Sequence, residues 1–226
     1  SKYSDSCGQD GVFAMKKSEL LLTIVVGLFS VLGVGFSITF LFTGGANEGF
    51  EQYPNVTLAH VVPGLIYLAL APLQFLQTIR SKYPAYHRWS GRILATIGLI
   101  LGGAALFIGI IIPYSGLLEQ IVIGGFGLFF LVSIVKGFLN ARRRNFEEHR
   151  EWMLRAYAIG LSIVTMRLIF IPILIVIGNP TREEAELYSI VSFTASFFLH
   201  WGFAEYWIRH TRSSGNASST SDAVSS

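Results

Sequence analysis

Six apolar runs divide this chain, and they constrain its fold more than any other feature of the sequence. A helix needs about 20 consecutive apolar residues to cross the hydrocarbon core of a bilayer, and each run is long enough. Only helices and closed barrels satisfy every backbone group in lipid, and these runs are too long and too uniformly apolar for barrel strands. The sequence therefore predicts an all-α, polytopic membrane protein with a six-transmembrane-helix bundle. Its helices are expected at about residues 20–42, 56–79, 91–112, 120–139, 152–177 and 187–208.

The composition agrees with a multi-pass integral membrane protein. Of 226 residues, 52% are hydrophobic and 14% are charged, whereas about a quarter of the residues in soluble domains are charged. The six-helix domain is predicted to cover residues 20–209, after a polar N-terminal segment formed by residues 1–19. Residues 210–226 are rich in serine and poor in apolar side chains, which predicts a disordered C-terminal tail. The single cysteine, Cys7, allows neither an internal disulfide nor a cysteine-based metal cluster.

Basic residues are distributed unequally between the two ends of the predicted helices. Of 17 Lys and Arg, all but Arg167 and Arg182 lie in or beside the N-terminal segment, the connections after the second and fourth helices, and the C-terminal flank. The opposite connections carry glutamates. Because Lys and Arg favour the cytoplasmic face of a membrane protein, both termini are predicted on the cytoplasm-like side. The expected partners are therefore the lipid bilayer and its anionic headgroups, and nucleic acid is excluded.

Two stretches repeat one order of residue types at the expected start of a helix. Residues 80–92 and 142–155 each contain a basic cluster, then a His-Arg pair, a Trp and a further Arg. We expect His87 and His149 to approach each other, with four arginines around them: Arg88, Arg92, Arg150 and Arg155. Such a site would hold a haem propionate, a phospholipid headgroup or an acidic partner segment, because guanidinium groups bind anions with several N–H donors. Without a metal, the histidines are expected to bond to Glu147 or Glu148.

Two more histidines, His60 and His200, are expected to point into the bundle from the second and sixth helices. On the third helix, small residues follow His87 along one face: Gly91, Ala95, Gly98, Gly102, Ala105 and Gly109. Such a face allows close helix packing, and it also suits a flat ligand such as a porphyrin, so both interpretations stay open. Two axial ligands of one iron lie at the same depth, which His87 and His149 satisfy better than the other pair.

Arg167 is the most costly residue within the predicted spans. An arginine at the centre of a span costs about 2.5–3.5 kcal/mol on insertion scales, so such a residue generally faces a partner or a cavity. We expect Arg167 to be a buried functional charge that faces the bundle interior, with His60 and Tyr67 as candidate polar partners. The alternative is that its side chain extends toward the outer membrane surface.

Four motifs are specific enough to compare with known families. They are Pro72-Leu-Gln74-Phe, Tyr86-His-Arg-Trp-Ser-Gly-Arg92, His149-Arg-Glu-Trp-Met-Leu-Arg155 and Thr165-Met-Arg167. With these motifs, residues 56–209 resemble a family of predicted membrane proteins known as a domain of unknown function, which implies no activity. The chain also resembles, more loosely, the transmembrane dihaem b-type cytochromes of the ascorbate-reductase type. That resemblance implies haem b, with His60, His87, His149 and His200 as cofactor-binding residues and iron held by His87 and His149.

The sequence therefore allows three functions. The first is a membrane redox protein that binds b-type haem and transfers electrons across the bilayer. The second is a transporter of a lipid or small molecule without a cofactor, although the spans lack the paired proline or glycine breaks that often mark transport sites. The third is a non-catalytic accessory subunit of a membrane complex. The spans contain no paired carboxylates and no nucleophile beside a base, so no catalytic residue is assigned.

Overall fold

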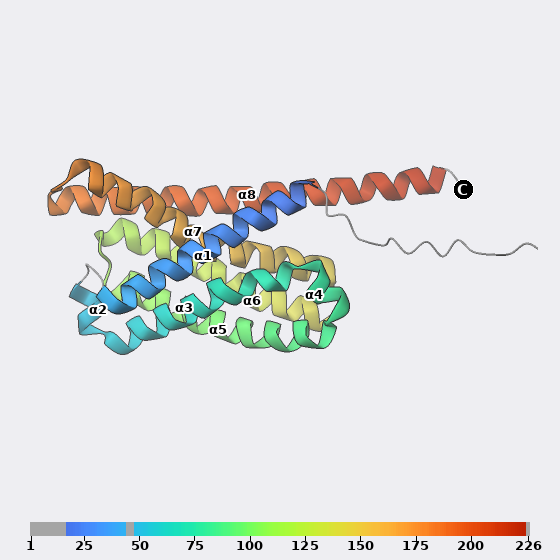
Figure 1. The fold of residues 1–226 in the computed structure, drawn as a ribbon, viewed down its shortest axis with the longest axis horizontal. Coiled ribbons are helices and arrows are strands. Elements are labelled where there is room, and N and C mark those ends of the chain that lie inside the picture. Colours follow the sequence, from blue (N-terminus) through green and yellow to red (C-terminus); the bar gives the residue numbers. More distant parts are fainter. Residues whose placement is uncertain (1–16, 44–47, 225–226) are drawn as a thin grey trace, which may run out of the picture.

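The structure, a computed structural model, describes residues 17–43 and 48–224, and these residues form eight helices and no strand (Figure 1). The helices are α1 (Lys17–Thr43), α2 (Glu48–Gln52), α3 (Pro54–Phe75), α4 (Gln77–Lys82), α5 (Pro84–Ile111), α6 (Gly116–Arg142), α7 (Phe146–Ile177) and α8 (Arg182–Val224). Six of them, all except α2 and α4, are long and apolar enough to cross a membrane. The prediction of an all-α, multi-pass membrane protein with six spans is confirmed.

Several helix boundaries differ from the predicted ones. Local capping residues determine where these helices begin and end, whereas the predictions used the ends of the apolar runs. The third span begins at Pro84 and not at residue 91, since proline fits the first turn of a helix, where no N–H bond is needed. The fifth span begins at Phe146, where the side chain of Asn145 caps the helix by accepting a bond from the backbone N–H of Glu148. The second span ends at Phe75, one turn after Pro72 removes a backbone donor from the ladder.

The last helix differs most from the prediction. It begins with reciprocal capping bonds: the hydroxyl of Thr181 accepts from the N–H of Glu184, and the Glu184 carboxylate accepts from the N–H of Thr181. It then continues to Val224, beyond the end predicted at residue 208, and the disorder predicted for residues 210–226 stays a prediction. Extending an existing helix costs far less than starting one, and no proline interrupts these residues. The predicted polar segment lies outside the described residues except for residues 17–19, which begin α1.

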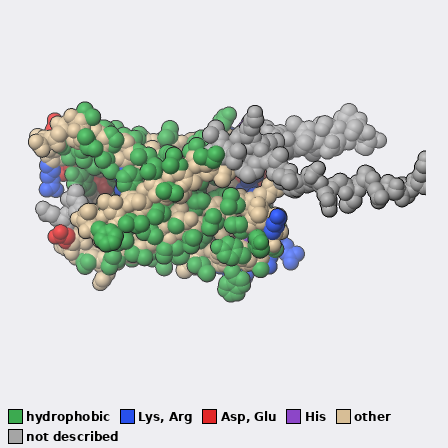
Figure 2. Space-filling model, in the orientation of Figure 1, with side chains coloured by type: hydrophobic (Ala, Val, Ile, Leu, Met, Phe, Trp, Pro, Cys, Tyr) green, Lys and Arg blue, Asp and Glu red, His purple; other side chains and the backbone are tan. Residues whose placement is uncertain are grey.

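The spans are arranged around four central helices, α3, α5, α6 and α7, which pack in chain order. Helix α1 lies across α3 and α7, while α8 packs mainly on α7. Figure 1 shows that the start of α1, α4, the α6–α7 connection and the later part of α8 share one end of the bundle, here called the inner end. Helix α2 and the α5–α6 and α7–α8 connections share the opposite, outer end. Figure 2 shows apolar side chains over the flank between them.

Glycines allow the central helices to approach closely. On α5, a Cβ on Gly98 would lie 2.5 Å from the Cδ1 of Ile134 and 3.3 Å from the ring of Tyr67. A Cβ on Gly102 would lie 2.6 Å from the Cδ2 of Leu131. Side chains of α6 therefore occupy the space beside these glycines. The small residues after His87 serve helix packing at these positions, which is one of the two interpretations that the sequence left open.

Substitution of two neighbouring glycines on α5 should distinguish the effect of helix packing on stability from the effect of helix propensity. Gly102→Ala is expected to lower the free energy of unfolding by about 1–3 kcal/mol, because the new methyl group overlaps Leu131 and Phe130. Gly103→Ala is the matched control, since a Cβ there meets no atom within 4 Å. The control should leave stability unchanged or raise it by up to about 1 kcal/mol. Unfolding of the detergent-solubilised variants measures both, and equal destabilisation would contradict the packing role.

The orientation of the bundle in the membrane remains a prediction from the basic residues. In a Cys7→Ser background, Lys82→Cys and Arg143→Cys should react with a membrane-impermeant maleimide from the cytoplasmic side of sealed vesicles. Glu183→Cys, at the outer end, should react only from the other side. The expected result follows from the retention of Lys and Arg on the cytoplasmic side. Labelling of Lys82→Cys and Arg143→Cys from opposite sides would contradict the six-span layout itself.

Candidate functional site

A cavity of about 540 Å³ lies between the helices in the outer half of the bundle. Every spanning helix contributes to its wall, and most of the lining side chains are apolar. Figure 2 shows the surface hollowed at the outer end. The volume is within the range of about 300–1,000 Å³ that is typical of small-molecule sites. The polar and titratable lining residues are Ser37, Thr39, Thr43, Thr57, His60, Tyr67, Tyr114, Glu119, Arg167 and Ser189.

Aromatic side chains close the cavity toward the inner end. Tyr67 of α3 is 2% exposed, and its ring lies 5.8 Å from that of Phe130 on α6 and 6.2 Å from that of Tyr157 on α7. The hydroxyl groups of Tyr157 and Ser30 are hydrogen-bonded at 2.7 Å, which ties α1 to α7 below the cavity. The rings of Tyr67, Phe130 and Tyr157 thus form an aromatic floor on the inner side of the cavity.

Arg167 of α7 is half-buried, and it lines this cavity. Its guanidinium carbon lies 5.9 Å from the ring centroid of Phe36 on α1. Among the described side chains, residues 23–43 and 50–212, none accepts a hydrogen bond from Arg167 or forms an ion pair with it. A cation that is removed from water without a carboxylate is energetically costly, and contact with one aromatic ring offsets only part of that cost.

His60 of α3 lines the same cavity and lies close enough to Arg167 for the two side chains to interact electrostatically. Its Nδ1 is 3.4 Å from the carbonyl oxygen of Leu101, so Nδ1 carries the proton in that contact and Nε2 is left as an acceptor. The structure therefore brings Arg167, His60 and Tyr67 around one space, as the sequence predicted. The direct polar contact that was expected between them is not found among the described residues.

Glu119 is the only acidic residue among the described residues that line the cavity. It lies near the outer end, on the first turn of α6. It is 5% exposed, and its carboxylate accepts a hydrogen bond from the backbone N–H of Ser115. The glutamate is thus used to hold the α5–α6 connection. It forms no ion pair with Arg167.

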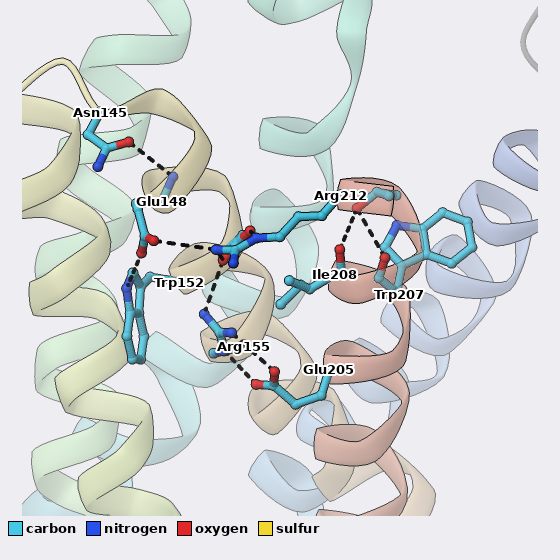
Figure 3. Close-up of polar contacts among 10 residues, drawn as sticks. Asn145, Glu148, Trp152, Arg155, Glu205, Trp207, Ile208 and Arg212 are labelled. Carbon is cyan, nitrogen blue, oxygen red and sulfur yellow. Dashed lines mark hydrogen bonds and ion pairs between the residues drawn. The ribbon is translucent and has the colours of Figure 1, made fainter. Parts of the chain in front are cut away.

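A second polar cluster lies at the inner end, between α7 and α8 (Figure 3). Arg155 donates two hydrogen bonds to the carboxylate of Glu205, at 2.6 and 3.1 Å. Arg155 is also 3.7 Å from Glu151, one turn earlier on α7. Arg212 of α8 binds the same Glu151 carboxylate, with one of its contacts at 2.6 Å. This cluster is a structural connection between the last two spans.

This cluster is not among the predicted sites, although the sequence contains a signal for it. Glu205 is an acid inside a predicted span, and Arg155 is a base inside another, so each needs a partner at a similar depth. Trp152 completes the cluster: Lys136 lies 4.4 Å and Arg155 4.7 Å from its ring centroid, and its indole N–H donates to Glu148 at 3.1 Å. Arg155 is thus occupied by protein side chains, which differs from its predicted role as an anion-binding residue.

The two histidines of the repeated stretches lie near each other but outside the cavity. His87 and His149 are within electrostatic range of one another, and the joint site predicted for them stays a prediction. The Nδ1 of His149 bonds to the carbonyl oxygen of Gly137 at 2.8 Å, so the bond to Glu147 or Glu148 that was expected without a metal is not formed. The Nδ1 of His87 is buried and has no hydrogen-bond partner among the described residues.

The arginines of these stretches do not form one ring around the histidines. Arg92 packs over the ring of Trp89 at 5.3 Å, and Arg88 is exposed. Arg150 lines a shallow surface pocket with Glu147 and Glu151. On α4, outside the spans, burial lowers the pKa of Arg80, and the positive charge of Arg150 lowers it further. The inner end is thus strongly basic, and binding of anionic headgroups there stays a prediction.

The described residues lend no support to a haem held between two axial histidines, and haem binding stays a prediction. His200 bonds through Nε2 to the hydroxyl of Thr165 at 2.7 Å, and neither it nor His87 or His149 lines the cavity. The glycine face that follows His87 packs against α6 side chains and leaves no flat wall beside that histidine. Among the described residues, no three His, Cys, Asp or Glu side chains are grouped to hold a metal ion. His60 is the one described histidine that faces open space inside the bundle.

The fold and the cavity define a six-span helical membrane protein with an internal site in its outer half. A family model described as predicted membrane protein (DUF2306) matches residues 57–208. This match covers well over half of the chain, so the chain belongs to the DUF2306 family, as the motifs indicated. The matched segment contains the spans α3 to α7, most of α8, and the cavity residues His60 and Arg167. No curated protein and no solved structure matches the chain.

The inner cluster yields a stability prediction. Glu205→Gln should lower the free energy of unfolding by about 3 kcal/mol, because it leaves the largely buried Arg155 without its main counter-charge. The matched control is Glu186→Gln, whose partner Arg182 is 82% exposed, and there the loss should stay below about 1 kcal/mol. Thermal unfolding in detergent measures the difference. A cost at Glu205 no larger than at Glu186 would show that the inner pair does not join α7 to α8.

Proposed function

We propose that this protein binds a lipid-like molecule inside the membrane, in the cavity of its outer half, and thereby handles or transports it. This is the second of the three functions considered from the sequence. The observation that carries it is the cavity itself, with its largely apolar wall, its aromatic floor and a minority of polar groups, among them Arg167 and His60. Pockets of this kind, apolar with a small number of placed polar groups, are the usual form of small-molecule sites.

The position of the cavity supports a ligand that comes from the bilayer or from the outer surface. The aromatic floor at Tyr67 separates the site from the inner end. The ion pairs between α7 and α8 hold the inner ends of these spans together. A ligand therefore exchanges on the outer side in the state described here, and release toward the inner end would require the helices around Tyr67 to separate.

Matched glycine variants test whether the cavity is the binding site. Gly64→Phe should fill part of it, because Gly64 lines the cavity and a Cβ there meets only the end of the Leu101 side chain, at 3.4 Å. Gly103→Phe is the control, since it adds the same ring to an exposed position on α5 that is outside the cavity lining. Native mass spectrometry of detergent-purified protein should show one retained lipid-like molecule in the wild type and in Gly103→Phe, and a loss in Gly64→Phe.

Equal retention by all three proteins would contradict binding in the cavity. An absorption spectrum of the same samples, before and after dithionite, tests the haem hypothesis, and haem bands in the reduced spectrum would contradict the present proposal. The accessory-subunit hypothesis predicts that no small molecule is retained by any of the three proteins. The experiment thus separates the three functions that the sequence allowed.

A further inference from the structure

We infer that the ligand of the cavity is a single-chain carboxylic acid whose carboxylate pairs with Arg167 while its alkyl chain lies along the apolar wall. This inference rests on the proposed function and assigns its ligand class. It starts from the one feature of the cavity that the described side chains do not explain. Arg167 is a cation inside the bundle, it faces an open space, and no described carboxylate neutralises it. An anion in that space would supply the missing counter-charge.

The charges around the cavity favour an anion with a single charge. Arg167 is the only Lys or Arg among the described lining residues. In the neutral tautomer that donates from Nδ1 to the carbonyl of Leu101, His60 adds no second positive charge to that of Arg167. Glu119 adds a carboxylate near the outer end. A phosphate monoester or a diphosphate would bring more negative charge than one arginine balances, whereas a carboxylate matches it.

The geometry of the polar groups agrees with a carboxylate headgroup. Arg167 lies ten residues before the end of α7 at Ile177, which is about 15 Å below the outer end of that helix. His60, bonded to the carbonyl of Leu101, lies at nearly the same level, because Leu101 is ten residues before the end of α5. A guanidinium group presents parallel N–H donors that fit both oxygens of a carboxylate.

The wall above and below this level is suited to one alkyl chain. Apolar side chains from four helices line the inner part of the space: Leu68, Phe130, Ile159, Ile163 and Phe197. Phe170, Ile171 and Leu174 continue the apolar surface toward the outer end. The cavity of about 540 Å³ has the size of a small-molecule site, which suits one alkyl chain with a small headgroup.

Binding of matched ligands to the whole protein tests this inference. Radiolabelled palmitate is offered to purified wild-type protein in detergent, with methyl palmitate and hexadecyl phosphate as unlabelled competitors of the same chain length. Palmitate should compete at least about tenfold better than methyl palmitate, because a hydrogen-bonded charge pair in an apolar site contributes well over a factor of ten. Hexadecyl phosphate should also compete less well than palmitate. These comparisons need no variant, so they hold even if a substitution of Arg167 prevents folding.

Variants then assign the effect to Arg167. Arg167→Gln should weaken palmitate binding about ten- to hundredfold and leave methyl palmitate unchanged, whereas Arg167→Lys should retain part of the preference for the acid. Arg182→Gln is the matched control at an exposed arginine and should bind palmitate like the wild type. If palmitate and methyl palmitate bind equally to the wild type, the acid inference is wrong while the lipid-binding proposal stands. If neither binds, and Gly64→Phe changes nothing, the proposed function itself is wrong.

Discussion

Close packing of four helices around Tyr67 is the interaction on which the rest of this structure depends. Glycines on α5 and α7 let the tyrosine ring lie between the helices, and no larger side chain would fit at Gly98 or Gly160 without displacing it. At the level of these glycine contacts, the helices are closely packed. Toward the outer end α3 and α7 are separated by the cavity, so the packing that stabilises the inner half also determines where the internal space begins.

The sequence predicted the spans because hydrophobicity and length report directly on the bilayer as a solvent. It also predicted that Arg167 faces the interior, because a charged side chain within a span is energetically costly when it faces lipid. It did not predict the cavity, since an internal space depends on the distances between helices and no single helix encodes them. The pair of Arg155 and Glu205 was missed for the same reason: the two residues are 50 positions apart, and only the packing of α8 on α7 joins them.

The repeated His-Arg stretches show that a sequence pattern can indicate the depth of residues in the membrane without indicating a binding site. Arginine and tryptophan are both favoured where a helix passes from water into lipid, so two helices that start on the same side acquire similar sequences there. In the structure the two copies have different roles. Arg92 packs on its own neighbour Trp89, whereas Arg155, the residue at the equivalent place, bonds to another helix. Similar depth brought His87 and His149 near each other without giving them a common partner.

The pairing of Arg155 with Glu205 has a consequence for how the chain is made. Synthesis proceeds from the N-terminus, so α7 reaches the membrane while the partner of Arg155 on α8 does not yet exist. Glu151, one turn away on α7, lies 3.7 Å from Arg155 and can balance its charge during that interval. When α8 follows, Glu205 binds Arg155, and Arg212 binds Glu151 in turn. The last span thus gives both members of the Arg155–Glu151 pair a second partner of opposite charge, and a chain that stops before α8 keeps only the pair within α7.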